Sequence, residues 1–166
     1  MAHADVDLKE PPRRRLGAVV LIQDGQHRVL LVKPTYRDGH QLPGGAVHQS
    51  ESIAEGAARE LEEETGLVRR LTHFVALDYV PYNSETGVAE GLNVVCDGGV
   101  LSDAAADAVA VPETAADELE SCLWAWPDQL HEYCLPYQER RIREALDAIE
   151  IGNELPLLVL GERISA

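Results

Sequence analysis

A short segment, "GGAVHQSESIAEGAARELEEETGL" (residues 44–67), joins a glycine pair to a run of helix-forming and acidic residues. Ser52 and Glu55 have the spacing of a capping box, in which each side chain bonds the other residue's backbone N–H at the start of a helix. Gly66 supplies the residue type that commonly follows a helix C-terminus. The segment therefore predicts a tight turn followed by a helix over residues 53–65.

The predicted helix has an apolar face and an acidic face. A helix turns by about 100° per residue, so Leu61 shares a face with small residues, namely Ala54, Ala57, Ala58 and Thr65. Glu60, Glu63 and Glu64 fall together beside that face, at spacings that make helical side chains neighbours. Gly56 lies in the same sector one turn earlier, so we expect it to leave room beside three crowded carboxylates.

Crowded carboxylates repel one another, and a cation between them relieves the repulsion. Mg²⁺ prefers carboxylate oxygens, and Mn²⁺ accepts the same ligands. Gly44 and Gly45 let the backbone turn tightly and offer a carbonyl oxygen to the same ion. The alternative is a solvated acidic helix without a bound ion, and the glutamates alone do not decide between the two.

The spacing of this segment resembles the Nudix box, G-x5-E-x7-R-E-U-x-E-E-x-G-U, in which U is a bulky aliphatic residue. The residues that fill its fixed positions are Gly45, Glu51, Arg59, Glu60, Leu61, Glu63, Glu64, Gly66 and Leu67. The flanking stretches "LPGG" and "LWAWPDQL" are also similar to those of the family. The resemblance therefore extends over roughly residues 16–150.

The resemblance implies an α/β/α sandwich on a mixed sheet, and an enzyme that hydrolyses a diphosphate linkage in a nucleoside diphosphate derivative. It implies ligands for Mg²⁺, or for Mn²⁺ in its place, which are Glu60, Glu63, Glu64 and the Gly44 carbonyl. It also implies residues that shape the site or orient the ligands, which are Gly45, Glu51, Arg59 and Gly66. The alternative function is a non-catalytic regulatory domain that binds a nucleotide, although such domains usually lose box glutamates that this chain retains.

Attack of water on a diphosphate needs a base or a metal-bound hydroxide. The candidates inside the box are Glu63 and Glu64. Many family members instead use a loop acid outside the box, but the aligned position here is Leu123, which has no acid–base chemistry. Glu118, and after it Glu120, are the nearest upstream acids, at the end of residues 101–120, which we expect to form a long exposed loop.

The substrate class stays open between a nucleoside triphosphate, an oxidised nucleotide and an ADP-ribose-like molecule. Tyr36 and Arg37 precede "LPGG", where they are candidates to stack on a base or to contact a phosphate. Their alternative role is that of ordinary exposed loop residues. Pro81 lies near a position associated with ADP-ribose cleavage in one subgroup of the family, but a turn proline explains it equally well.

The rest of the chain predicts an α/β protein with a mixed sheet and helices on its faces. Branched apolar runs predict strands over residues 16–22, 28–33, 71–80, 90–98 and 121–126. An Asp-Gly pair after the first strand predicts a hairpin, and an amphipathic pattern predicts a helix over 136–149. Residues 155–160 suit an edge strand or a clamp over the core. We expect a flexible arm over residues 1–15 and one domain over 16–166.

Charge and cysteine content limit the partners and the compartment. The formal net charge of −15 argues against nucleic acid or an anionic membrane as a partner, whereas a small phosphorylated ligand remains compatible when a metal supplies positive charge. The cysteines are odd in number and form no C-x-x-C pair, so we expect free thiols, a reducing compartment and a cytoplasmic location. The sequence leaves a homodimer open.

Overall fold

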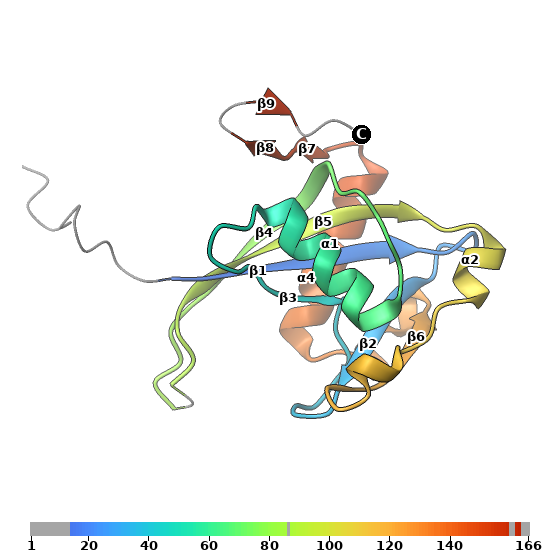
Figure 1. Ribbon diagram of the computed structural model, residues 1–166, viewed down its shortest axis with the longest axis horizontal. Coiled ribbons are helices and arrows are strands. Elements are labelled where there is room, and N and C mark those ends of the chain that lie inside the picture. The colour runs from blue at the N-terminus through green and yellow to red at the C-terminus, as the bar shows by residue number, and fades with distance from the viewer. Residues whose placement is uncertain (1–13, 86, 160–161, 164–166) are drawn as a thin grey trace, which may run out of the picture.

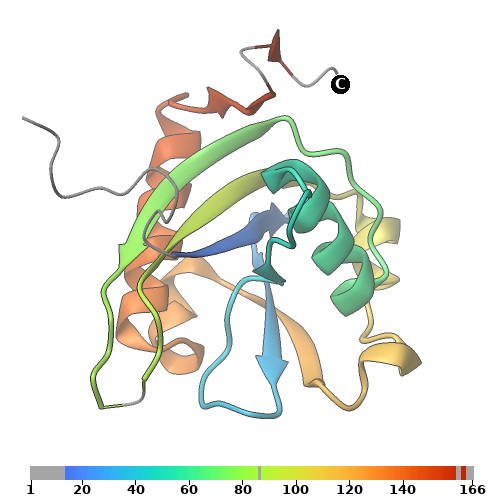
Figure 2. The ribbon, with the colours of Figure 1, turned by 60° about the vertical axis from the view of Figure 1, so that its left-hand side comes forward.

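A mixed β-sheet lies between two helices, α1 (Ile53–Thr65) and α4 (Pro136–Glu150), in the computed structural model of the chain (Figure 1; Figure 2). The structure describes residues 14–85, 87–159 and 162–163. Figure 2 shows α1 on one side of the sheet and α4 on the other. The predicted α/β/α sandwich is therefore confirmed.

The sheet combines parallel and antiparallel neighbours. Its strands are β1 (Arg15–Gln23), β2 (Val29–Pro34), β3 (Gly44–Ala46), β4 (His73–Val80), β5 (Gly91–Val100), β6 (Leu119–Ala125) and β7 (Leu155–Pro156). The order across the sheet is β6-β2-β1-β5-β4-β7, with β3 paired to β1. β1 runs parallel to β5 and antiparallel to both β2 and β3, so the central strand carries the mixed character.

Side-chain alternation along β1 divides the core into two layers. Successive side chains of a strand point to opposite faces, so Val20 packs in the layer that contains Leu61 of α1. Val19 and Leu21 pack in the layer that contains Ile142 of α4. Because both faces of β1 are covered, this strand is apolar almost throughout, which is the pattern that the sequence displays.

The β1–β2 hairpin predicted from Asp24 and Gly25 is confirmed, since Gln23 pairs with Val29. The Asp24 carboxylate accepts hydrogen bonds from the backbone N–H of Gln26 at 3.0 Å and of Arg28 at 2.9 Å. This bonding explains how a buried aspartate is tolerated at the turn. The prediction missed β3, because a three-residue strand that begins with two glycines carries no strand signal.

Residues 101–120 do not form the exposed loop predicted from the sequence. They contain a short helix α2 (Asp103–Asp107) and a 3₁₀ turn η1 (Glu113–Ala115). Four of their apolar side chains are buried, namely Leu101, Ala106, Ala115 and Leu119. The prediction was wrong because alanines spaced along an acidic segment, which look soluble in sequence, pack here against Val32 and the α1-side core.

The remaining elements are short. They are η2 (Pro127–Gln129), α3 (Leu130–Tyr133), β8 (Leu158–Val159) and β9 (Glu162–Arg163). Two of them, β8 and β9, form a separate two-stranded sheet. Within residues 155–160, β7 forms the predicted edge strand against β4, and Leu160 lies outside the described residues.

Three further predictions concern the N-terminal arm, the cysteines and a membrane span. Of the expected arm, residues 1–13 also lie outside the described part, whereas Arg14 pairs with Glu90 at 2.9 Å. The three cysteines are free thiols, as predicted. Among the described residues, no helix has the length and apolar character needed to cross a membrane.

Candidate active site

The predicted helix and its caps are confirmed in α1. The Ser52 hydroxyl accepts a hydrogen bond from the Glu55 backbone N–H at 3.2 Å, and the Glu55 carboxylate accepts one from the Ser52 N–H at 2.8 Å. Gly66 ends the helix with a φ of 71°, a left-handed conformation that favours glycine. These caps fix the register of the helix, and with it the direction in which its carboxylates point.

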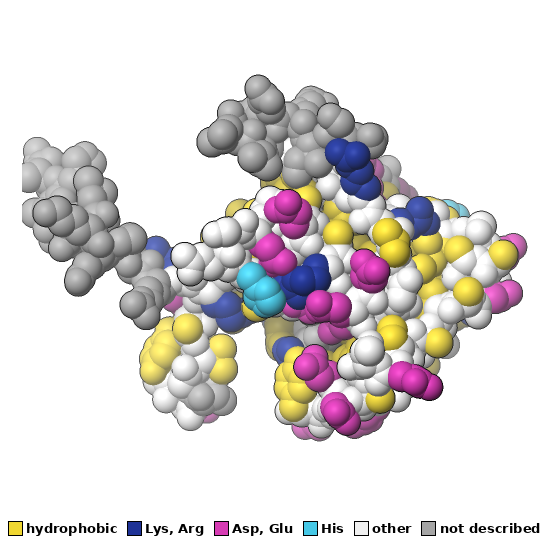
Figure 3. Space-filling model, in the orientation of Figure 1, with side chains coloured by type: hydrophobic (Ala, Val, Ile, Leu, Met, Phe, Trp, Pro, Cys, Tyr) yellow, Lys and Arg dark blue, Asp and Glu magenta, His cyan; other side chains and the backbone are white. Residues whose placement is uncertain are grey.

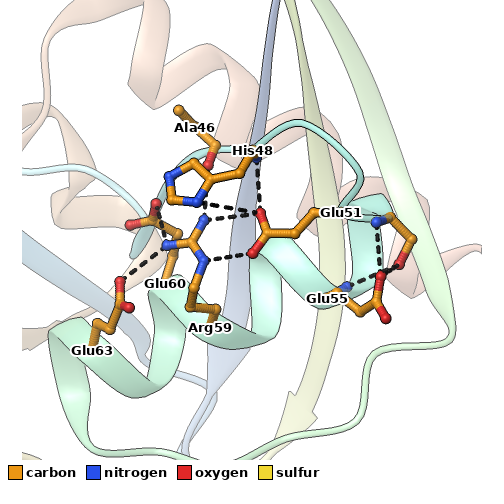
Figure 4. Close-up of polar contacts among 8 residues, drawn as sticks. Ala46, His48, Glu51, Glu55, Arg59, Glu60 and Glu63 are labelled. Carbon is orange, nitrogen blue, oxygen red and sulfur yellow. Dashed lines mark hydrogen bonds and ion pairs between the residues drawn. The ribbon is translucent and has the colours of Figure 1, made fainter.

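Arg59 joins three carboxylates of the box, those of Glu51, Glu60 and Glu63, into one network (Figure 4). Its Nε and Nη2 donate to the two oxygens of Glu51 at 2.7 and 3.1 Å. Its Nη1 donates to Glu60 at 2.9 Å and to Glu63 at 3.0 Å, and Nη2 also donates to the Ala46 carbonyl at 3.0 Å. A guanidinium has five N–H donors, and Arg59 uses all of them. Three tie α1 to the segment that precedes it, and two bind glutamates of α1 itself.

The bidentate pair with Arg59 controls the protonation of Glu51. The hydrogen bonds from Arg59, with one from the His48 backbone N–H, lower the pKa of Glu51 to about 2. The same pairing raises the pKa of Arg59 above its ordinary value. The space left by Gly56 serves this pair, because a Cβ there would lie 3.1 Å from a Glu51 oxygen. The expectation that Gly56 opens room beside the other glutamates is therefore corrected.

The glycine pair brings β3 against the acidic side of α1. A Cβ on Gly45 would lie 2.7 Å from the carboxylate atoms of Glu60, so only a glycine lets this carboxylate approach the strand. Gly44 has a φ of +135°, and its N–H donates to Glu64 at 2.7 Å. In the structure, Gly44 therefore contacts the box through its backbone N–H, whereas its carbonyl oxygen was predicted from the sequence as a metal ligand.

Glu64 is the box glutamate whose ionisation costs most. Burial raises its pKa to about 8, and the charges of Glu60 and Glu118 act in the same direction, against the hydrogen bond from Gly44. The positive charge of Arg37 also opposes the rise. Carboxylates that resist ionisation in this way mark a place where a cation would be favoured.

These groups share a cavity of about 610 Å³ that runs from the acidic side of α1 to the face covered by α4. Its acidic end is lined by Gly44, Gly45, Glu60, Glu64 and Glu118. Tyr36 and Arg37, the candidates for substrate contacts, also line it, and the Arg37 guanidinium lies 5.0 Å from the centre of the Tyr36 ring. The opposite end is lined by Arg15, Val80, Val88, Asn93, Tyr137 and Arg141.

Two of the predicted metal ligands and candidate bases lie apart from this cavity. The Glu63 side chain is 59% exposed and is held by Arg59, and Glu120 is exposed on β6; the cavity lining includes neither. Within the described residues, no three histidine, cysteine, aspartate or glutamate side chains converge closely enough to hold a metal ion. Figure 3 shows acidic and basic side chains interspersed over α1, which agrees with an acidic cluster that Arg59 partly neutralises.

Sequence reasoning missed the residues at the far end of the cavity. They come from β1, from the end of β4 and the segment after it, from β5, and from the first turns of α4. The strands among these elements are joined by the sheet topology. The polar residues Gln138 and Arg141 at the start of the predicted helix were a signal that its inner face was not purely apolar. Asn93, in the middle of an apolar strand, was a second signal.

A model of the NUDIX domain matches residues 13–146 of the chain, which includes every element of the cavity. The chain belongs to the Nudix family. An RNA pyrophosphohydrolase from Stenotrophomonas maltophilia is 43% identical over 56 residues, which cover 34% of this chain and 26% of that relative. The match thus spans only about a quarter of the relative's length.

Solved structures of Nudix proteins share the fold. The MutT protein of Methanosarcina mazei Go1 has a TM-score of 0.65 at 23% identity, over 88% of this chain and 99% of that one. The NUDIX domain of Shewanella oneidensis NrtR, complexed with ADP ribose, has a TM-score of 0.66 at 16% identity, over 90% and 99%. At these sequence identities, the structural similarity supports a shared fold and does not extend to a shared activity.

Proposed function

We propose that this Nudix protein hydrolyses a diphosphate linkage in a nucleoside diphosphate derivative, with the help of a divalent cation. The observation that carries the proposal is a cavity lined by Glu60, Glu64 and Glu118, in which Gly45 leaves room for the Glu60 carboxylate and the Gly44 N–H bonds Glu64. The family membership and the similarity to RNA pyrophosphohydrolases support the same reaction class. We also propose that residues 16–166 act as one domain.

The donor set fits Mg²⁺ or Mn²⁺, because both prefer carboxylate oxygens. Glu60 and Glu64 would hold the ion, with Glu63 as a further ligand after it exchanges its contact with Arg59. The Gly44 carbonyl is the proposed backbone ligand. When bound, such an ion would neutralise diphosphate oxygens and lower the pKa of bound water.

The cavity residues have separable roles in this reaction. Arg37 lies where its positive charge reaches Glu64, so we assign it to a phosphate oxygen of the substrate and Tyr36 to its support. Glu118 is exposed at the cavity wall, and its backbone is fixed because its carbonyl accepts a hydrogen bond from the Thr35 N–H at 2.9 Å. An exposed carboxylate on a fixed backbone at the cavity wall suits a general base for the attacking water.

The test is cleavage of a panel of nucleoside triphosphates, oxidised nucleotides and ADP-ribose, with Mg²⁺ and with EDTA. The products are separated by anion-exchange chromatography, because cleavage of the diphosphate in ADP-ribose yields AMP and ribose 5-phosphate and no free phosphate. We expect cleavage of at least one of them with Mg²⁺ and none with EDTA. Tight nucleotide binding without cleavage under any condition would contradict the enzyme assignment and favour the regulatory alternative.

A further inference from the structure

Two buried amide side chains line the cavity away from the acidic end. Asn93 on β5 is 7% exposed and Gln41, between β2 and β3, is 8% exposed. In the part of the chain that the structure describes, neither Asn93 Nδ2 nor Gln41 Nε2 donates a hydrogen bond. No fully buried polar atom of the described side chains lacks a partner. Both nitrogens therefore keep some exposed surface, and both residues line the cavity.

The orientation of Asn93 is fixed by Arg15. A guanidinium can only donate, so the atom of Asn93 that lies 3.3 Å from Arg15 Nη1 must be the oxygen. The NH₂ group therefore points away from Arg15. Gly17 makes this arrangement feasible, because a Cβ at Gly17 would collide with the Asn93 oxygen.

The orientation of Gln41 is fixed through Gln138. The Leu135 backbone N–H donates to Gln138 Oε1 at 3.4 Å, which directs the Gln138 NH₂ group toward Gln41. Gln138 Nε2 then donates to Gln41 Oε1 at 3.3 Å. Since the oxygen of Gln41 is engaged, the group that it offers to a ligand is again an NH₂.

The surroundings of the two amides suit a planar, weakly polar ring. Val80, Val88 and Tyr137 line the same end of the cavity. The Arg141 guanidinium there is already paired, since its Nε and Nη2 lie 2.7 and 2.6 Å from Asp78 Oδ2. It also lies 5.5 Å from the centre of the Tyr137 ring. Because Asp78 compensates the charge of Arg141, this end of the cavity offers mainly apolar surface and the hydrogen-bond donors of the two amides.

We infer that this end of the cavity binds the nucleobase, and that Asn93 and Gln41 select bases with hydrogen-bond acceptors, favouring 6-keto over 6-amino purines. This inference rests on the proposed function. A 6-keto purine presents O6 and N7, which both accept, whereas adenine presents an N6 amine beside N7. An amine that faces the amide NH₂ groups leaves buried donors unpaired, which is costly.

The closing experiment compares inosine and adenosine 5′-triphosphates, whose bases differ in the group at C6 and the adjoining ring proton. Binding is measured by calorimetry with Ca²⁺, and hydrolysis is measured separately with Mg²⁺ by chromatography of the nucleotide products. We expect the inosine nucleotide to bind at least about fivefold more tightly, the lower range for loss of a good base contact. Asn93→Asp keeps an acceptor for Arg15 and replaces the donor, so it should abolish or invert this ratio, as should Gln41→Glu.

The matched control is Gln26→Glu in the exposed β1–β2 turn, which makes the same chemical change away from the cavity and should keep the ratio. The ratio in the parent protein tests the inference even where a variant fails to fold. Equal binding of the two nucleotides would overturn the inference, while their hydrolysis would leave the proposed function standing. Failure of both to bind would overturn the inference, and hydrolysis of other substrates in the panel would then decide the proposed function alone.

Discussion

At the scale of single residues, Glu64 gives the site a pH dependence with a definite sign. Its pKa is raised from 4.5 to about 8 in the folded protein, so the folded state retains a proton that the unfolded state loses. The free energy of unfolding of the metal-free protein should therefore fall as the pH rises from about 4.5 to 8. Urea unfolding in EDTA between pH 5 and 9 measures this. Glu64→Gln should flatten the fall, and parallel curves for parent and variant would contradict the account.

Glu51 predicts the opposite dependence at lower pH. Its pKa is lowered from 4.5 to about 2 by Arg59, so its contribution to stability is present above pH 4.5 and is lost as the pH falls toward 2. Glu51→Gln should reduce the free energy of unfolding at pH 5 and make little difference near pH 2. The matched control is Glu62→Gln, an exposed helix glutamate. Equal losses of stability in the two variants at every pH would contradict a stabilising role for the Glu51–Arg59 pair.

At the scale of elements, β3 contains two adjacent glycines with different roles. Gly44 is needed for folding, and Gly45 is needed for the site. Gly45 lacks a positive φ, so Gly45→Ala keeps the backbone but puts a Cβ 2.7 Å from the Glu60 carboxylate. We expect near-parent unfolding stability and weaker Mg²⁺ binding by calorimetry. Gly44→Ala combines a φ of +135° with a collision against the β1 backbone, so it should lower the melting temperature strongly. The reverse ranking would be inconsistent with this geometry.

Glu118 and Glu120 are both candidate bases by sequence, but they differ in their position relative to the cavity. Glu118 lines the cavity and lies just before the strand, whereas Glu120, two residues on, lies outside the lining. General-base assistance contributes about 10²–10⁴-fold in rate, so Glu118→Gln should lower kcat by about that factor while Glu120→Gln changes it little. Comparable losses in both variants, or none in either, would remove Glu118 from the role of base.

The same elements show what the sequence could and could not predict. The helix of the box was predicted to the residue, because a capping box and a terminal glycine mark its ends locally. β3 and the buried packing of residues 101–120 were not predicted, because contacts with distant strands determine both. Within the site, spacing predicted which glutamates are neighbours on the helix. It could not predict that Arg59 would hold Glu63 outside the cavity.

At the scale of the whole molecule, the sheet joins two chemically different ends in one cavity. The box helix supplies the acidic end from one face, and β5 with α4 supplies amide and aromatic groups from the other. Asn93 is distant from the box in sequence, and the parallel pairing of β1 with β5 brings it near the box in the fold. No local sequence pattern could therefore predict that the two lie close together. A substrate with a diphosphate at one end and a base at the other matches this division.

The most direct test of the central claim is the initial rate of substrate cleavage as a function of Mg²⁺ concentration, with the best nucleotide of the panel. We predict saturable activation in the parent and in the exposed control Glu62→Gln, and none in EDTA. Glu64→Gln should need far more Mg²⁺ or lose at least about tenfold in rate, since even residues that only orient metal ligands have effects of that size. The same Mg²⁺ dependence in Glu64→Gln and in the parent would contradict a metal site at this end of the cavity.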